Sequence, residues 1–191
     1  MQRWPAPLHD EDSEPTERNP THGESLWRFT QRDKATIRAV SLELGRTTDR
    51  KPPFKYSALE RVGFSDTDAQ GIVYYGRYLP FFDLARVEYQ RHLGMLDLRR
   101  HEHEFVMRAC TIDYLAPARF DDLIEIFIRV SKIGRTSVTY ECAAYRVDND
   151  AMMVTAHQTL VLVELASHTP SPVPDRFRKT IRAFEGADLE E

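Results

Sequence analysis

The chain has 191 residues, of which 41% are hydrophobic and 29% are charged. This length and composition suit one globular domain, alone or with an appendage, and exclude a wholly disordered chain. The formal net charge of −4 gives no case for a nucleic-acid binder. No apolar run approaches the roughly 18 residues of a membrane span, and the charged N-terminus is unlike a signal peptide. We therefore expect neither nucleic-acid binding nor membrane insertion.

Side chains that could act as metal ligands or thiol nucleophiles give only weak signals. Cys110 and Cys142 lie in strand-like runs, and two cysteines do not make a disulfide framework. Reduced thiols and a cytoplasmic location are therefore predicted. The triplet His101-Glu102-His103 alternates potential ligands, but it sits in a stretch rich in Arg and Glu. A solvated loop is the better interpretation, and no metal site is predicted there.

Residues 1–56 differ in composition from the rest of the chain. They contain six of the 11 prolines. Their ten basic and nine acidic side chains give a net charge of +1, against 16 basic and 21 acidic side chains and a net charge of −5 for the remainder. We predict an N-terminal extension over 1–56, partly disordered, with a short helix within 25–44 and a linker at 51–53, followed by a domain over 57–191. The extension could be a partner-binding or regulatory arm, or a tail with no task of its own or a wrongly assigned start.

The domain alternates segment types in a readable order. The predicted elements are strands at 56–64, 105–114, 122–132, 137–147 and 152–164, a long helix at 76–93 and a terminal helix at 175–184. The long helix has one apolar face, made by Tyr78, Phe81, Phe82, Ala85, Tyr89 and Leu93. The sheet must bury one face, and this helix is the element available to cover it. An α+β domain follows.

The most informative segment runs from Phe64 to Tyr78. Asp66 and Asp68 precede Gly71, and an apolar dipeptide then leads into the start of the long helix. A glycine lets the backbone come close to a ligand. The first N–H groups of a helix are unpaired and carry positive partial charge, so they can stabilise the oxyanion that forms from a thioester carbonyl. A carboxylate just upstream can attack the carbonyl carbon or activate a water.

This segment, followed by Tyr78 and Ala85-Arg86, resembles the 4-hydroxybenzoyl-CoA thioesterase family of the hot-dog superfamily, which includes the YbgC-like and FadM-like acyl-CoA thioesterases. Residues 117–122 and 132–138 also resemble strand connections of that family. The resemblance covers residues 57–183. It implies a hot-dog fold, in which a curved five-stranded antiparallel sheet wraps around one long central helix, with the extension outside it.

The resemblance also implies an acyl-CoA thioester hydrolase without a metal or organic cofactor. Asp68 matches the catalytic carboxylate, as nucleophile or general base, and the backbone N–H of Tyr75 matches the oxyanion donor. The enzyme would be a homodimer or homotetramer with its active site at the dimer interface. The implied substrate-binding residues are Gly71, Ile72, Val73, Tyr74 and Tyr78 near the acyl group, and Arg135, Thr136 and Ser137 in the turn that holds CoA.

Structural interpretations of the same residues stay open at this point. Asp68 could simply cap the following turn, and Asp66 is expected to orient the loop. Tyr74 and Tyr78 could pack in the core rather than line an acyl pocket. Arg135 could be an ordinary solvated hairpin residue, although its charge suits a CoA phosphate.

Four other functions compete with acyl-CoA hydrolysis. The substrate could be an acyl-carrier-protein thioester, or the domain could bind acyl-CoA without turnover as a regulator or carrier partner. A DNA-binding regulator is disfavoured, because the extension has a net charge of only +1 and a single helix-like stretch. Hydratases of the superfamily carry a His five residues after an Asp. Five residues after Asp68 this chain has Val73, so hydratase chemistry lacks its second residue here.

Overall fold

The computed structural model describes residues 44–96 and 102–190, all of which belong to one compact unit. Residues 1–43 of the predicted extension, which hold all but the last residue of the range 25–44 expected to contain a helix, lie outside these residues. The division of the chain at residue 56 into an extension and a domain stays a prediction.

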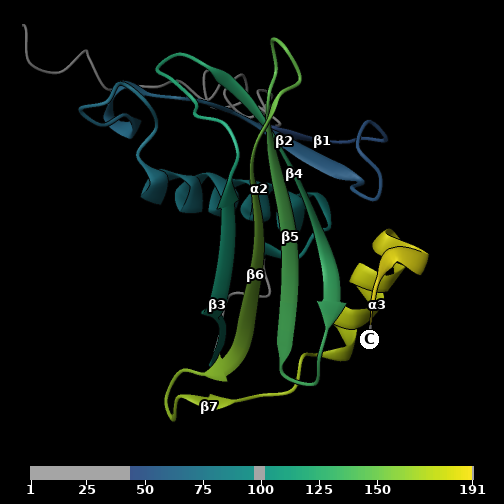
Figure 1. Ribbon diagram of the computed structural model, residues 1–191. Coiled ribbons are helices and arrows are strands. Elements are labelled where there is room, and N and C mark those ends of the chain that lie inside the picture. Colours follow the sequence, from purple (N-terminus) through teal and green to yellow (C-terminus); the bar gives the residue numbers. More distant parts are fainter. Residues whose placement is uncertain (1–43, 97–101, 191) are drawn as a thin grey trace, which may run out of the picture. The chain divides into compact units, whose positions relative to one another are not determined.

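Seven strands form one antiparallel sheet (Figure 1). Its order is β1-β2-β4-β5-β6-β3, and β7 pairs with β6 beside this path. The strands are β1 (Gly45–Thr47), β2 (Tyr56–Arg61), β3 (His103–Tyr114), β4 (Leu123–Ile133), β5 (Ser137–Arg146), β6 (Met152–Glu164) and β7 (Thr169–Pro170). The five predicted strands correspond to β2 to β6. Alternating apolar side chains located them, because one face of the sheet is buried.

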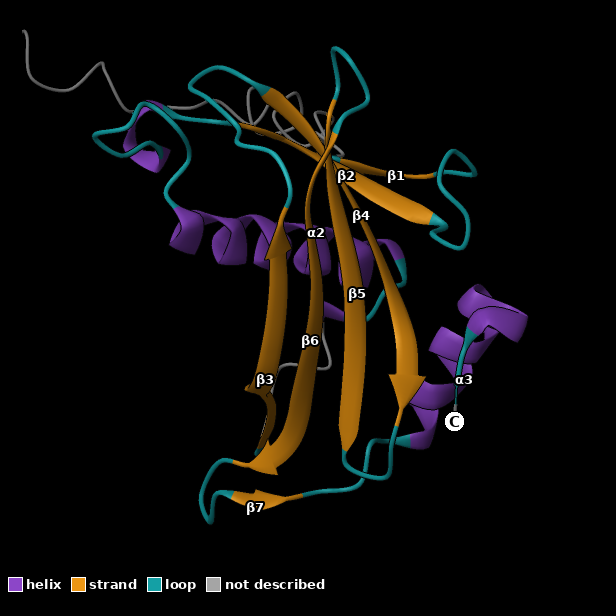
Figure 2. Cartoon of the chain, viewed as in Figure 1, coloured by secondary structure: helices purple, strands orange, loops and turns teal. Residues whose placement is uncertain are grey.

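One long helix, α2 (Tyr78–His92), lies across a face of the sheet (Figure 2). A 3-10 turn, Tyr75–Arg77, precedes it. Its predicted apolar face is buried: Tyr78, Phe81, Phe82, Ala85 and Tyr89 are each at most 4% exposed. Gly94 ends the helical segment with a φ of 66°, a conformation that glycine adopts without strain. The prediction of a sheet packed on one central helix is therefore confirmed.

The sheet is wider than predicted on the β2 side. β1 pairs with β2, so the predicted linker at 51–53 lies in the connection between two paired strands. A buried acid holds this connection in place: Glu125, on β4, is 2% exposed and pairs with Arg46 and Arg50. The carboxylate also accepts a hydrogen bond from Ser57 Oγ at 2.8 Å. A buried charge needs such partners, and the β1 segment supplies them.

The C-terminal segment covers the part of β4 that β2 leaves unpaired. α3 (Asp175–Glu185) and a 3-10 turn, Gly186–Asp188, lead to Glu190, whose backbone pairs beside Lys132. Glu185 is fully buried and accepts hydrogen bonds from Tyr89 Oη at 2.5 Å and from the Val130 N–H at 3.2 Å. A β-bulge follows Val130. The terminal helix was predicted within one residue of its observed end, but its contacts with β4 were not.

Candidate active site

The loop before α2 is fixed by its first carboxylate. Asp66 is 5% exposed, and its Oδ2 accepts a hydrogen bond from the Gly63 N–H at 2.8 Å. Its Oδ1 accepts from Arg77 Nε at 2.7 Å and forms an ion pair with the same guanidinium. Both carboxylate oxygens are therefore occupied. Asp66 orients the loop, as expected from the sequence, and is not available to a substrate.

Asp68 occupies a different position in the same loop. It is half-buried, and its Oδ1 accepts a hydrogen bond from the Gln70 N–H at 2.8 Å. The capping role left open above is therefore present. Gly71 turns the chain with a φ of 73°, and its N–H donates to the Asp68 carbonyl at 3.0 Å. Within the described residues no group donates to Asp68 Oδ2, so one carboxylate oxygen is left for chemistry.

The backbone at the start of α2 leaves a donor free. The Val73 N–H donates to the Ala118 carbonyl, and the Tyr74 N–H donates to the Asp66 carbonyl. These two hydrogen bonds fix the backbone just before the helical segment. The next N–H, that of Tyr75, donates no such hydrogen bond in the described part of the chain. It opens the helical segment, where N–H groups lack intrahelical acceptors and bear positive partial charge.

Asp68 and Tyr75 line the same cavity, which has a volume of about 370 Å³. Five of the predicted site residues are there: Asp68, Ile72, Val73, Tyr75 and Tyr78. The remaining wall consists of Gln70 and of residues 114–117, which end β3 and begin the next loop. The cavity therefore joins a half-buried carboxylate, a free backbone donor and apolar walls.

Aromatic side chains shape this cavity. Tyr78 is buried, and its Oη accepts a hydrogen bond from the Ala118 N–H at 3.2 Å. Burial raises the pKa of Tyr78, so its phenol stays neutral at physiological pH. Tyr114 donates from Oη to the Tyr75 carbonyl at 3.1 Å, and burial also raises the pKa of Tyr114. Tyr78 packs in the core and also lines the cavity, and its contact with an acyl group stays a prediction.

Two predicted residues lie beside the cavity rather than in its wall. Gly71 is exposed in the loop, and no heavy atom outside its chain neighbours lies within 4 Å of where its Cβ would be. Tyr74 is 44% exposed, and its ring centroid lies 4.3 Å from that of Tyr75. A hydrogen bond with Tyr75 raises the pKa of Tyr74. These two tyrosines form an exposed aromatic pair, of which Tyr75 lines the cavity.

The predicted CoA-binding turn is far from this cavity within one chain. Arg135 and Thr136 connect β4 to β5, and Ser137 begins β5. Ser137 pairs with Val161, and Val161 pairs with Val106 near the start of β3. Tyr114, at the other end of β3, lines the cavity. The structure therefore does not bring Arg135, Thr136 and Ser137 together with Asp68 in a single chain.

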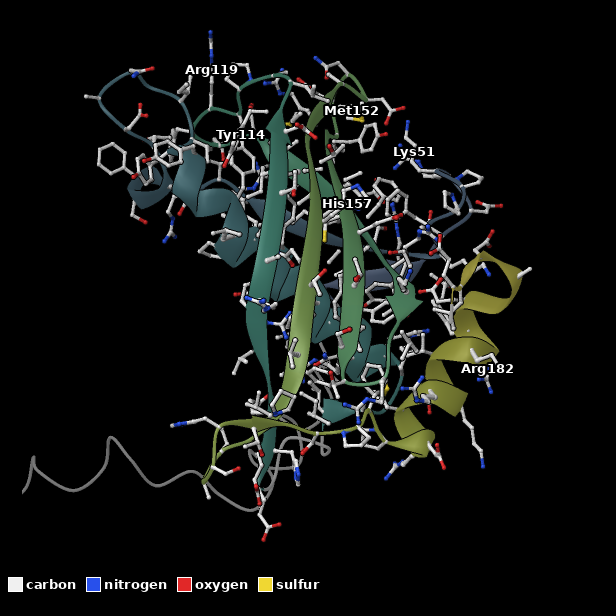
Figure 3. The ribbon with its side chains drawn as sticks, turned by 60° about the horizontal axis from the view of Figure 1, so that its bottom comes forward. Lys51, Tyr114, Arg119, Met152, His157 and Arg182 are labelled. Atoms are coloured by element: carbon white, nitrogen blue, oxygen red, sulfur yellow. The ribbon has the colours of Figure 1, made fainter. Side chains whose placement is uncertain are left out.

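The sequence interpretation missed the wall formed by residues 114–117. Tyr114 and Leu115 are 49% and 55% exposed, which is unusual for such side chains at the end of a strand. Figure 3 shows Tyr114 and Arg119 at the same end of the sheet. The sequence shows an apolar strand end followed by Pro117, which marks the position of this wall. No local sequence pattern links that strand end to Asp68.

The comparisons with known proteins place the chain in a family. Residues 62–181 match the model of the thioesterase-like superfamily. The chain belongs to this superfamily. It is 35% identical over 117 residues to the acyl-CoA thioesterase YbgC of Haemophilus influenzae, which is 60% of this chain and 85% of the relative. It is 33% identical over 116 residues to the acyl-CoA thioester hydrolase YbgC of an Escherichia coli strain, covering 60% and 86%.

A crystal structure of a probable thioesterase from Bartonella henselae has the same fold. It superposes with a TM-score of 0.56 at 30% identity, over 62% of this chain and 98% of that chain. These findings confirm the predicted resemblance to YbgC-like thioesterases, the predicted hot-dog fold and the prediction that the chain is a hydrolase.

Two further features concern residues 44–96 and 102–190 alone. No group of three or more His, Cys, Asp or Glu side chains is arranged there to hold a metal ion. No helix in that part of the chain is long and apolar enough to cross a membrane.

Proposed function

We propose that the protein hydrolyses acyl-CoA thioesters to a free acid and CoA. The observation that carries this proposal is the shared cavity of Asp68, with one unoccupied carboxylate oxygen, and the free N–H of Tyr75. A base or nucleophile next to a backbone oxyanion donor is the arrangement that acyl transfer requires. The YbgC relatives, which carry acyl-CoA thioesterase names, support the choice of substrate class.

Two routes are open for the carboxylate. As general base, Asp68 takes a proton from a water whose oxygen attacks the thioester carbon. As nucleophile, its own oxygen attacks and forms an acyl anhydride, which water then cleaves. In both routes the carbonyl oxygen becomes negative beside the Tyr75 N–H, and the C–S bond then breaks. The CoA sulfur leaves with the electron pair. It takes up a proton, from the Asp68 carboxyl in the general-base route and from water in the nucleophilic route.

We further propose that the enzyme is at least a homodimer, paired through β3. Within the described residues β3 is twelve residues long and pairs with β6 on one side only. Its helix-facing side chains lie opposite buried residues of β6, yet Met107 and Tyr114 are 46% and 49% exposed. A long apolar edge favours pairing with another strand. A second copy can satisfy it by twofold antiparallel pairing.

Such a dimer would resolve the separation of the predicted site residues. In an antiparallel pair of β3 strands, the start of one strand lies beside the end of the other. Arg135, Thr136 and Ser137 lie at the level of the start of β3, while Asp68 lies near its end. The turn would then reach the Asp68 cavity of the other copy. This is how the three residues could hold CoA, and why one chain alone does not show it.

The cytoplasm is the proposed compartment. Cys110 and Cys142 are both free thiols, which suits a reducing environment.

Release of free thiol from a panel of acyl-CoAs tests the catalytic proposal. The panel spans acetyl- to palmitoyl-CoA with benzoyl-CoA, each measured with wild type, Asp68→Asn and Asp49→Asn. Asp49 is exposed in the β1–β2 connection and serves as the matched control. We expect Asp68→Asn to lower kcat at least about 100-fold, because a positioned base contributes about 10² to 10⁴. Asp49→Asn should match wild type. An active Asp68→Asn enzyme would overturn the assignment.

A further inference from the structure

The turn between β4 and β5 is held by an arginine of the C-terminal helix. Arg178, near the start of α3, donates from Nη2 to the Gly134 carbonyl at 2.6 Å and to the Arg135 carbonyl at 3.2 Å. Its Nε donates to the Val173 carbonyl at 3.2 Å. The Val173 N–H in turn donates to the Arg135 carbonyl at 2.9 Å. One guanidinium therefore joins three backbone carbonyls and ties α3 to the turn proposed above to hold CoA.

The remaining carbonyls of this turn are also occupied. The Thr136 carbonyl accepts a hydrogen bond from the Leu162 N–H, and the Ser137 carbonyl accepts one from the Gly134 N–H, each at 2.8 Å. Carbonyl oxygens carry negative partial charge, so they repel a phosphate that they face. Because all four carbonyls of residues 134–137 are directed to donors within the protein, the side chains of the turn are left to meet an anion.

Arg135 is the side chain of this turn that suits a phosphate. It is exposed, and no ion pair among the described residues involves it. A long exposed side chain loses conformational freedom when it binds, and a fixed backbone makes that loss smaller. We propose that Arg178 is a positioning residue for CoA, which clamps the turn so that the Arg135 guanidinium is held ready for a CoA phosphate. This inference deepens the proposed function, because it concerns the turn proposed there to bind CoA.

The helix that carries the clamp is itself firmly anchored. Phe177 and Ile181, on either side of Arg178 in the sequence, are 3% and 0% exposed. The ring centroid of Phe177 lies 5.3 Å from that of Phe105, on β3. At the other end of the helix, Glu185 accepts the hydrogen bond from Tyr89 described above. Figure 1 shows the chain passing beside the β4–β5 turn as it enters α3. The guanidinium is therefore presented from a rigid support.

Calorimetric titration with CoA provides the first test. Arg178→Met keeps the length of the side chain and removes its donors. We expect the Kd for CoA to rise about tenfold, because hydrogen bonds from a charged donor contribute more than neutral ones. Arg176→Met removes the same charge from an exposed position on the same helix and should leave the Kd unchanged. Equal Kd values for wild type and Arg178→Met would overturn the inference.

A double-mutant cycle tests whether Arg178 acts through Arg135. Arg135→Met should weaken CoA binding by itself, because the phosphate loses its partner. Once that partner is gone, positioning it has no further value, so Arg135→Met with Arg178→Met should bind CoA about as weakly as Arg135→Met alone. Losses that simply multiply in the double variant would show that Arg178 acts independently of Arg135, and would overturn the positioning role.

Turnover separates positioning from a general loss of structure. Arg178→Met should raise the KM for an acyl-CoA and leave kcat within about twofold of wild type, since the clamp contributes to binding alone. The N-acetylcysteamine thioester of the same acyl group has no phosphate, so its kcat/KM should not change. A fall in kcat on both thioesters would show that Arg178 only supports the fold, and would overturn the inference.

A conservative variant separates the clamp from the charge of the helix. Arg178→Lys keeps the positive charge but has a single nitrogen, which cannot span three carbonyls. We expect it to bind CoA nearly as weakly as Arg178→Met. A wild-type Kd for Arg178→Lys would assign the effect to charge and overturn the clamp.

This inference and the proposed function fail in different ways. Calorimetry with CoA does not depend on Asp68. A wild-type protein that binds CoA through Arg178 but hydrolyses no thioester overturns the proposed function and supports the clamp. A wild-type protein that hydrolyses acyl-CoA, but whose CoA affinity is the same without Arg178, supports the proposed function and overturns the clamp. Wild type without measurable CoA binding also overturns the clamp.

Discussion

The two edges of the sheet differ in how far other segments of the chain cover them. On the β2–β4 side, β1 pairs with β2, and the C-terminal segment covers the rest of β4 through Glu185 and Glu190. On the other side, β3 has twelve residues without a second partner in the described part of the chain. Exposed strand edges promote unwanted association, and proteins usually protect them. We therefore attribute the covering of the β2–β4 edge to stability, and the uncovered β3 edge, whose end lines the Asp68 cavity, to the proposed dimer.

Removing β1 should have the largest effect on stability. A chain that begins at Phe54 lacks Arg46 and Arg50 and leaves the buried Glu125 carboxylate with Ser57 as its polar partner. An uncompensated buried charge costs about 3 kcal/mol or more. We expect a loss of this order in the free energy of unfolding, measured by urea denaturation.

The matched reference is a chain that begins at Leu44, so that the two chains differ only in the segment carrying β1. Equal free energies of unfolding for the two would show that β1 does not protect this edge.

A smaller effect should appear in the pH dependence of stability. Burial raises the pKa of Glu185 above its ordinary value of about 4.3, so the folded state binds this proton more tightly than the unfolded state does. The resulting stabilisation is complete below about pH 4 and is lost as pH rises through the folded-state pKa. Glu185→Gln has no proton to lose. The part of the pH dependence of the free energy of unfolding that comes from Glu185 should therefore disappear.

Urea denaturation at a series of pH values between about 4 and 7 measures that difference. Glu190→Gln, at an exposed position on the same segment, should keep the wild-type slope. Parallel curves for wild type and Glu185→Gln would mean that the proton on Glu185 does not contribute to closing this edge.

How far the sequence predicts this molecule depends on how local each feature is. Strand and helix positions follow from side-chain periodicity, and Asp68, Val73, Tyr75 and Tyr78 meet because they are neighbours in one loop and helix start. β1 escaped prediction because three residues carry too little periodic signal.

Features built from distant segments were not predictable in the same way. Tyr114 reaches the Asp68 cavity only through the placement of β3. The partners of Glu125 and Glu185 lie 55 to 96 residues away in the chain. Arg135 is separated from Asp68 by the length of β3 within one chain, and no pattern within the sequence specifies that separation.

The uncovered β3 edge allows the most direct test of the proposed dimer and of its role in activity. Met107→Lys puts a charge on the helix-facing side of β3, and Met152→Lys is the matched control, because both methionines are similarly exposed, at 46% and 41%. Sedimentation velocity and thiol release are measured on the same samples. We predict that Met107→Lys becomes a monomer and loses at least about tenfold in kcat/KM, while Met152→Lys stays dimeric and active. A fully active Met107→Lys monomer would contradict the claim that the site is completed by a second copy at β3.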